Sequence, residues 1–194
     1  MRSSRASRVC NRRVQSAVLL LLALLATPAA ALDTVYLVRH AEKAAFWPSD
    51  LDPFQPLAAE GMVRAEALAV RLKNTGIVAV YSSRTTRTLA TGAPLAQAAG
   101  IPLIAADDST KPDQMAAFLA RLREKHSADR AVLVVGHSNT LPELLLRLGA
   151  APDCYARLNI TGQPGSLLIE GYEGLWKVDL KKKGCDGIQR ETQR

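Results

Sequence analysis

The sequence is poor in the residues that build metal sites. It has three cysteines and three histidines among 194 residues, with no His-x-x-His or Cys-x-x-Cys spacing, which excludes the usual zinc-binding patterns. It also lacks the lysine-containing glycine-rich loop of nucleotide-binding proteins and the Gly-x-Ser-x-Gly turn of many serine hydrolases. We therefore expect no metal ion and no organic cofactor.

Long apolar runs are equally scarce, since only residues 17–26 form one. A polytopic membrane protein is excluded because each membrane span needs about 20 apolar residues. Repeats and low-complexity segments are absent as well. Apolar residues make up 48% of the chain and charged residues 22%, so the composition and the length predict one folded domain.

The single apolar run has the surroundings of a secretory signal peptide. Five arginines and no acidic residue precede it, and Ala29-x-Ala31 follows it. We expect cleavage after Ala31, which gives a signal peptide, residues 1–31, and one domain, residues 32–194. The alternative is an uncleaved anchor helix, for which the run is short. The expected location is periplasmic or secreted, with no membrane span in the mature chain.

The positive charge of the sequence belongs largely to this expected signal peptide. The formal net charge is +7, but without the five arginines 20 basic residues face 18 acidic ones. The domain that remains carries a net charge of about +2, which does not favour a nucleic-acid partner.

Two cysteines remain in the expected mature chain, Cys154 and Cys185. An exported protein meets an oxidising compartment, where two free thiols tend to pair. We therefore predict a Cys154–Cys185 disulfide, with two unpaired thiols as the alternative.

Strand and helix patterns alternate along the rest of the chain. Strands are expected at 35–38, 77–81, 102–105 and 131–135, and helices at 57–75, 84–99, 113–126 and 140–148. Segments 166–172 and 175–180 flank Glu173-Gly174 and predict a hairpin. The order predicts an α/β three-layer sandwich, a mostly parallel central sheet with helices on both faces and a C-terminal antiparallel hairpin.

Reactive side chains follow three of the predicted strands, where ligands bind in such folds. Arg39 and His40 follow the first strand, Arg84 and Arg87 follow the second, and His137 follows the buried strand at 131–135. Arginine forks match phosphoryl oxygens, and a neutral imidazole can attack phosphorus. The sequence therefore predicts a site for a small phosphorylated substrate.

Two of these segments resemble histidine motifs of the histidine phosphatase superfamily, which is phosphoglycerate mutase-like. Arg39-His40 is similar to its Arg-His-Gly motif, with Ala41 in place of the glycine. Residues 134–138 are similar to its second-histidine motif, which here contains His137. Two further segments strengthen the resemblance. Residues 57–61 resemble the family's Leu-Thr-x-x-Gly helix start, with Ala58 in place of the capping threonine, and residues 83–91 resemble its Ser-x-x-x-Arg-x-x-x-Thr motif. The four motifs occur in family order across residues 34–148.

The resemblance implies roles for the site residues. His40 would be the nucleophile that forms a phosphohistidine, and Arg39, Arg87 and a protonated His137 would complete the phosphate pocket. Arg84 would be an additional phosphate contact with less weight, because its position in the motif is not that of the family's arginine.

The proton donor for the leaving group is the open assignment. Many family members supply a Glu or Asp from the segment after the second motif, where this chain has Asp107 and Asp108. We weigh helix capping equally with catalysis for both and place Asp108 slightly ahead. Glu42 is a third candidate. Small phosphohistidine phosphatases of the superfamily have no such acid.

Together these expectations describe an exported, metal-independent phosphomonoesterase of the histidine acid phosphatase type, a hydrolase. Two alternatives stay open: a phosphohistidine-protein phosphatase and a non-catalytic phosphate-binding module. A mutase is less expected, because mutases usually carry a longer insertion over the site. The sequence leaves the natural substrate and the oligomeric state open.

Overall fold

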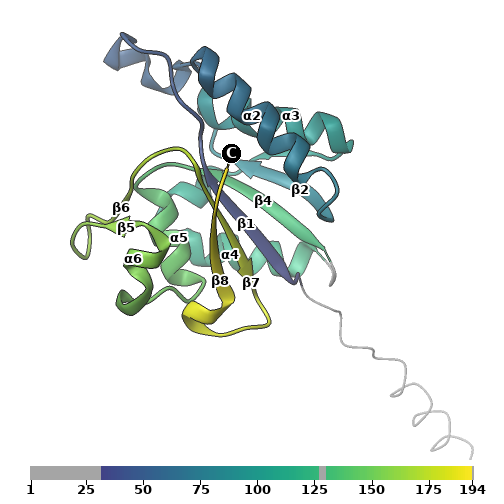
Figure 1. Ribbon diagram of the computed structural model, residues 1–194, viewed down its shortest axis with the longest axis vertical. Helices are drawn as coiled ribbons and strands as arrows, with labels where there is room; N and C mark the ends of the chain where they lie inside the picture. Colours follow the sequence, from purple (N-terminus) through teal and green to yellow (C-terminus); the bar gives the residue numbers. More distant parts are fainter. Residues whose placement is uncertain (1–31, 127–129, 194) are drawn as a thin grey trace, which may run out of the picture. The chain divides into compact units, whose positions relative to one another are not determined.

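A computed structural model describes residues 32–126 and 130–193. The expected signal peptide and its cleavage site lie outside the described residues. The described chain forms a six-stranded sheet in the order β3-β2-β4-β1-β7-β8 (Figure 1). Its strands are β1 (Thr34–Arg39), β2 (Ile77–Ser82), β3 (Leu103–Ala105), β4 (Ala131–Gly136), β7 (Gly174–Asp179) and β8 (Ile188–Thr192). Strands β1 to β4 are mutually parallel, whereas β7 is antiparallel to both β1 and β8.

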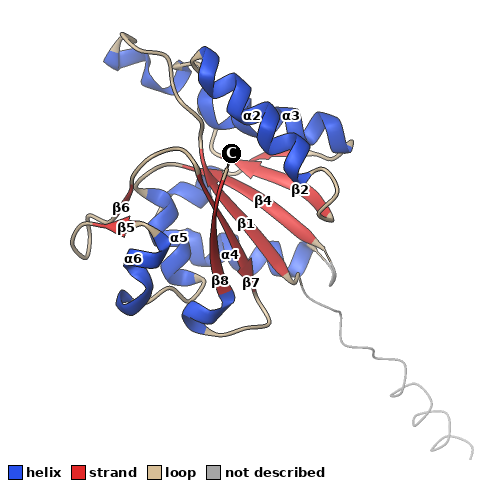
Figure 2. Ribbon diagram, in the orientation of Figure 1, coloured by secondary structure: helices blue, strands red, loops and turns tan. Residues whose placement is uncertain are grey.

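Helices cover both faces of this sheet, as Figure 2 shows. The helices are α2 (Ala59–Leu72), α3 (Thr86–Ala99), α4 (Met115–Lys125), α5 (Thr140–Arg147) and α6 (Tyr155–Leu158). Short 3₁₀ turns are η1 (Ser49–Phe54), η2 (Asp107–Thr110), η3 (Pro152–Cys154) and η4 (Gly184–Gly187). Within the described ranges, no helix combines the length and apolarity that crossing a membrane requires. The expected three-layer α/β fold is confirmed.

Alternate residues of the central strands point into two separate cores. In β4, Val132 and Val134 pack with residues of α4 and α5, whereas Leu133 and Val135 pack with residues of α2 and α3. All six residues of β4 are buried. This explains why the strand has a continuous apolar sequence instead of an alternating one.

Helix α2 lies against the backbone that follows β1, and Gly61 permits this approach. A Cβ atom on Gly61 would overlap the carbonyl oxygen of Glu42, which explains why the helix-start motif contains a glycine. The N-cap residue Ala58 makes no side-chain capping bond, as expected from the missing threonine. Its backbone N–H instead donates to the carbonyl of Glu42 at 2.9 Å.

The C-terminal part of the chain corrects the predicted hairpin. Strand β6 (Leu168–Ile169) pairs with β5 (Ile160–Thr161) in a separate two-stranded sheet, and β7 pairs with β8. The real hairpin therefore joins 174–179 to 188–192, a segment that the sequence pattern left unassigned. The mostly polar pattern of β8, Ile188–Thr192, gave little sign of a strand at the sheet edge.

The predicted disulfide is present in the structure, where Cys154 and Cys185 are bonded with their Cα atoms 6.0 Å apart. Cys154 ends η3 and Cys185 lies in η4. The bond therefore ties the connection between β7 and β8 to the segment after α5.

Candidate active site

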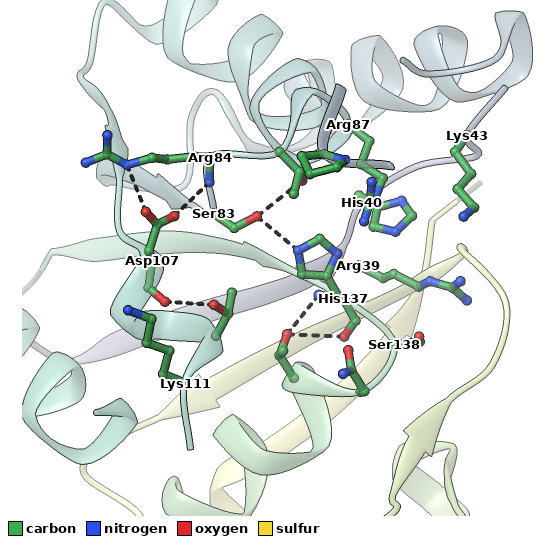
Figure 3. Close-up of a pocket in the computed structure, with 15 residues that line it drawn as sticks. Arg39, His40, Lys43, Ser83, Arg84, Arg87, Asp107, Lys111, His137 and Ser138 are labelled. Atoms are coloured by element: carbon green, nitrogen blue, oxygen red, sulfur yellow. Dashed lines mark hydrogen bonds and ion pairs between the residues drawn. The ribbon is translucent and has the colours of Figure 1, made fainter. Parts of the chain in front are cut away.

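Three neighbouring strand ends form one site, because β4 lies between β1 and β2 in the sheet. Arg39 is in register with Gly136, and the N–H of His40 donates to the carbonyl of Gly136 at 2.9 Å. The imidazole rings of His40 and His137 are consequently neighbours, with centroids 5.3 Å apart (Figure 3). Residues 97 positions apart in sequence therefore meet at one edge of the sheet, as predicted.

The buried His40 ring is held in one tautomer. Its Nδ1 lies 2.8 Å from the carbonyl oxygen of Ala41, and because a carbonyl only accepts, Nδ1 carries the proton. Nε2 then keeps its lone pair. Burial lowers the pKa of His40 to about 3, and the positive charges of Arg39 and Arg87 act in the same direction. His40 is thus a neutral imidazole near pH 7, as a nucleophile must be.

The second imidazole departs from the expectation of a protonated group. Burial, followed by the charge of Arg87, lowers the pKa of His137 to about 4, which favours its neutral form near pH 7. Its Nε2 lies 2.9 Å from Oγ of Ser83. Its backbone N–H donates to Oγ1 of Thr140 at 2.9 Å, at the start of α5.

Arg39 is positioned by an aromatic ring and a carbonyl. Its guanidinium lies 4.2 Å from the centroid of the Tyr172 ring, and Nη1 donates to the carbonyl of Gly171 at 3.0 Å. The Tyr172 ring also lies 5.8 Å from the ring of His40. Tyr172 was not among the predicted site residues, because the sequence placed it in a hairpin strand.

Arg87 is buried beside the histidine pair at the start of α3. Its Nη1 donates to the carbonyl of Asp52 at 2.7 Å, and its Nη2 donates to a carboxylate oxygen of Asp52 at 3.0 Å. Asp52 belongs to η1 in a proline-rich stretch where the sequence gave no sign of a site residue. The carbonyl of Arg87 accepts from Oγ1 of Thr91, which also accepts from the N–H of Ala41, so α3 is tied to the His40 segment.

A cavity of about 630 Å³ opens over these groups. It is lined by Arg39, His40, Arg87 and His137. The remaining lining residues are Lys43, Pro53, Ser83, Arg84, Thr85, Asp107, Thr110, Lys111, Ser138, Asn139 and Thr140. Lys43 and Lys111 were not predicted, and they add to the positive charge around the histidines. The arrangement is suited to an anion with several oxygens.

Arg84 reaches the rim of the cavity and not its centre. Its side chain is 76% exposed, and its Nε pairs with a carboxylate oxygen of Asp107 at 2.8 Å (Figure 3). The backbone N–H of Arg84 donates to the other carboxylate oxygen at 3.0 Å. Asp107 therefore holds the segment after β2 and neutralises Arg84, which weakens the prediction that Arg84 contacts phosphate directly.

Two of the proposed acids lie outside the cavity lining. The carboxylate of Asp108 binds Arg121 at 2.5 Å, so the structure does not support the preference for Asp108 over Asp107. Glu42 makes a two-oxygen contact with Arg64, which lowers the pKa of Glu42. That carboxyl is ionised near pH 7 and has no proton to give.

Fold and site together define an α/β protein with paired histidines and arginines beyond the ends of parallel strands. Residues 35–108 match the family model of the histidine phosphatase superfamily, branch 1. This match supports the resemblance to the superfamily and supports a phosphatase, that is, a hydrolase.

Solved structures show the same fold. A candidate phosphohistidine phosphatase, SixA, from Agrobacterium tumefaciens is 22% identical, with a TM-score of 0.59 over 81% of this chain and 94% of that one. A protein histidine phosphatase SixA in complex with tungstate is 19% identical, with a TM-score of 0.59 over 82% and 97%. A mycobacterial glucosyl-3-phosphoglycerate phosphatase in complex with VO₃ is 15% identical, with a TM-score of 0.57 over 84% and 98%. No curated protein sequence matches the chain.

Proposed function

We propose that this protein hydrolyses phosphomonoesters through a phosphohistidine on His40. The observation that carries the proposal is the geometry of the two imidazoles, a buried His40 and a partly buried His137, whose ring centroids lie 5.3 Å apart near Arg39 and Arg87. Burial lowers the pKa of both rings, which favours their neutral forms. A neutral Nε2 with its partner nitrogen fixed by a carbonyl is a prepared nucleophile. The arginines supply permanent positive charge for the oxygens of the transferring group.

The reaction has two displacement steps. Nε2 of His40 attacks phosphorus, a P–N bond forms, and the P–O bond to the alcohol breaks with its electron pair on the leaving oxygen, which takes up a proton. Water then attacks the phosphohistidine, the P–N bond breaks, and its electron pair returns to Nε2 as inorganic phosphate leaves. Arg39, Arg87 and His137 stabilise the equatorial oxygens in both steps.

The donor chemistry of the site supports metal-independent catalysis. Three cationic side chains, Arg39, Lys43 and Arg87, surround the two imidazoles and disfavour a divalent cation next to them. Among the described residues, Asp153, Cys154 and Cys185 form a group of possible metal ligands whose ligand atoms lie within 4.8 Å of one another. Both of those cysteines are in the disulfide.

One observation favours phosphohistidine protein as a second substrate class. Asp107 borders the cavity, but its two carboxylate oxygens accept hydrogen bonds from the Arg84 backbone and side chain. A free acid for an alkoxide leaving group is therefore not evident among the described cavity residues. A nitrogen leaving group needs less protonation than an alcohol. The two SixA structures, whose names describe histidine phosphatases, are consistent with this class.

Export is proposed on the sequence and supported by the disulfide. A Cys154–Cys185 bond is stable in an oxidising compartment and rare in a reducing one. We propose a periplasmic or secreted protein that starts after Ala31.

The function is tested with an aryl phosphate, with a chelator present, on the wild type and on His40→Ala. We expect chelator-resistant turnover that is lost in His40→Ala. Comparing Asp107→Asn on alkyl and aryl phosphates then tests the proton donor. A larger loss of rate on alkyl phosphates would assign the role of proton donor to Asp107. Equal losses of rate on both classes would favour leaving groups that need no acid. Phosphate binding without turnover would instead support the non-catalytic module.

A further inference from the structure

The guanidinium of Arg87 is engaged by Asp52. It donates to both the carbonyl and the carboxylate of Asp52, at 2.7 and 3.0 Å. The other carboxylate oxygen of Asp52 lies 3.8 Å from Nζ of Lys43. The Arg87 side chain is only 9% exposed, whereas Asp52 is 47% exposed. Asp52 thus takes two donors of the proposed phosphate arginine, one with its partly exposed carboxylate and one with its backbone carbonyl.

The segment that carries Asp52, residues 44–56, has few other anchors. Turn η1 has no buried residue, and Phe46 is fully exposed with a positive φ of 55°. Trp47 and Gln55 donate to carbonyls within the segment itself. Among the described residues, the side-chain hydrogen bonds and ion pairs between this segment and the rest of the protein run through Asp52.

A phosphoryl group competes well for the same donors. It offers three oxygens and up to two negative charges, whereas the Asp52 side chain offers two oxygens and one charge. Arg87 and Lys43 would therefore exchange the carboxylate for the stronger anion when substrate enters. That exchange removes the polar contacts that hold segment 44–56 in place.

We propose that Asp52 is an internal stand-in for phosphate, a specificity-determining residue that substrate must displace from Arg87. The proposal rests on the proposed phosphate pocket but not on turnover. Displacement raises the KM for every phosphorylated substrate and selects against weaker anions. It also frees segment 44–56 to move when phosphate binds.

Tryptophan fluorescence reports this exchange directly. The chain has two tryptophans, of which Trp176 is fully buried and Trp47 lies in the segment with 37% exposure. Acrylamide quenching therefore follows Trp47 over a constant background. Inorganic phosphate is the probe, and Asp52→Asn is compared with Asp50→Asn, which removes the same charge from the same exposed turn.

In the wild type and in Asp50→Asn, we expect phosphate to increase the quenching of Trp47. In Asp52→Asn the quenching is already high without phosphate, and phosphate binds about 1.5- to 5-fold more tightly, as expected on losing a half-exposed ion pair. All three proteins should melt at similar temperatures, because η1 contributes nothing to the core.

The proposal is overturned if Asp52→Asn and Asp50→Asn match in quenching and in phosphate affinity. It is also overturned if Asp52→Asn loses turnover on alkyl phosphates with phosphate affinity unchanged, since Asp52 would then act as a proton donor. Phosphate-induced quenching without turnover would support the exchange and count against the proposed hydrolase. Turnover without any phosphate-induced change in Trp47 quenching would support the hydrolase and overturn the proposed exchange.

Discussion

At the scale of single residues, burial lowers the pKa of both imidazoles of the candidate site. His40 is 4% exposed and surrounded by positive charge, so its neutral form is strongly favoured. The strand-end motifs were sufficient to predict His40, His137, Arg39 and Arg87 as a group. They could not predict Asp52, Lys43, Lys111 or Tyr172, because those side chains reach the site from loops that have no local pattern.

Loss of either phosphate arginine should slow the reaction strongly. For Arg39→Ala and Arg87→Ala we expect a lower kcat/KM. The decrease should correspond to a loss of about 2–4 kcal/mol in transition-state stabilisation, the range for removing one preorganised donor. Arg147→Ala is the control, since Arg147 pairs with Glu143 on an exposed helix face. Steady-state kinetics on an aryl phosphate measures kcat/KM for each variant. Arg39→Ala and Arg87→Ala variants as active as Arg147→Ala would refute the assigned roles.

The same imidazoles should make stability depend on pH. The pKa values of His40 and His137 are lowered from 6.5 to about 3 and about 4. Below pH 6.5 the unfolded chain therefore takes up protons that the folded protein does not. As the pH is lowered below 6.5, the free energy of unfolding should decrease by up to about 1.4 kcal/mol per pH unit for each imidazole. Urea unfolding at pH 7, 6 and 5 measures this, and the His40→Gln variant should have a shallower slope. A flat profile in the wild type would contradict the burial argument.

At the scale of elements, most helices and strands were predictable because their patterns agree with their burial. The fully apolar 131–135 run became the central β4, and Gly100 is the C-cap of α3. Helix α2 ends at Leu72, before the predicted stop at Gly76. The C-terminal hairpin was assigned wrongly. Gly174 begins β7 instead of forming a turn, because β7 fills the place next to β1 and leaves the preceding segment to pair with β5.

The position of helix α2 depends on the close approach of Gly61 to the backbone of Glu42. Gly61→Ala should lower the free energy of unfolding by about 1–3 kcal/mol, because the new methyl group meets the backbone of Glu42 and helix or loop must shift. Glu60→Ala, on the exposed side of the same turn, is the control and should change stability little. Chemical denaturation of both variants tests this. Equal stability of the two would show that α2 does not depend on the close approach.

At the scale of the whole molecule, the disulfide closes the C-terminal part of the domain over a separation of 31 residues. Loop-closure entropy for that length corresponds to about 3–4 kcal/mol. A Cys154→Ser, Cys185→Ser double variant should lose about that much stability and become insensitive to reductant. Melting with and without reductant measures it. A wild type that melts identically in reductant would remove the structural role of the bond.

Trapping the intermediate tests whether His40 carries the phosphoryl group. The protein is mixed with an aryl phosphate, denatured within the first turnover and kept alkaline, because phosphohistidine is labile to acid. Peptide mass spectrometry then locates the added phosphate. We expect a phosphorylated peptide containing His40 that is absent from His40→Ala. Phosphate on another residue, or turnover that persists in His40→Ala, would contradict this role of His40.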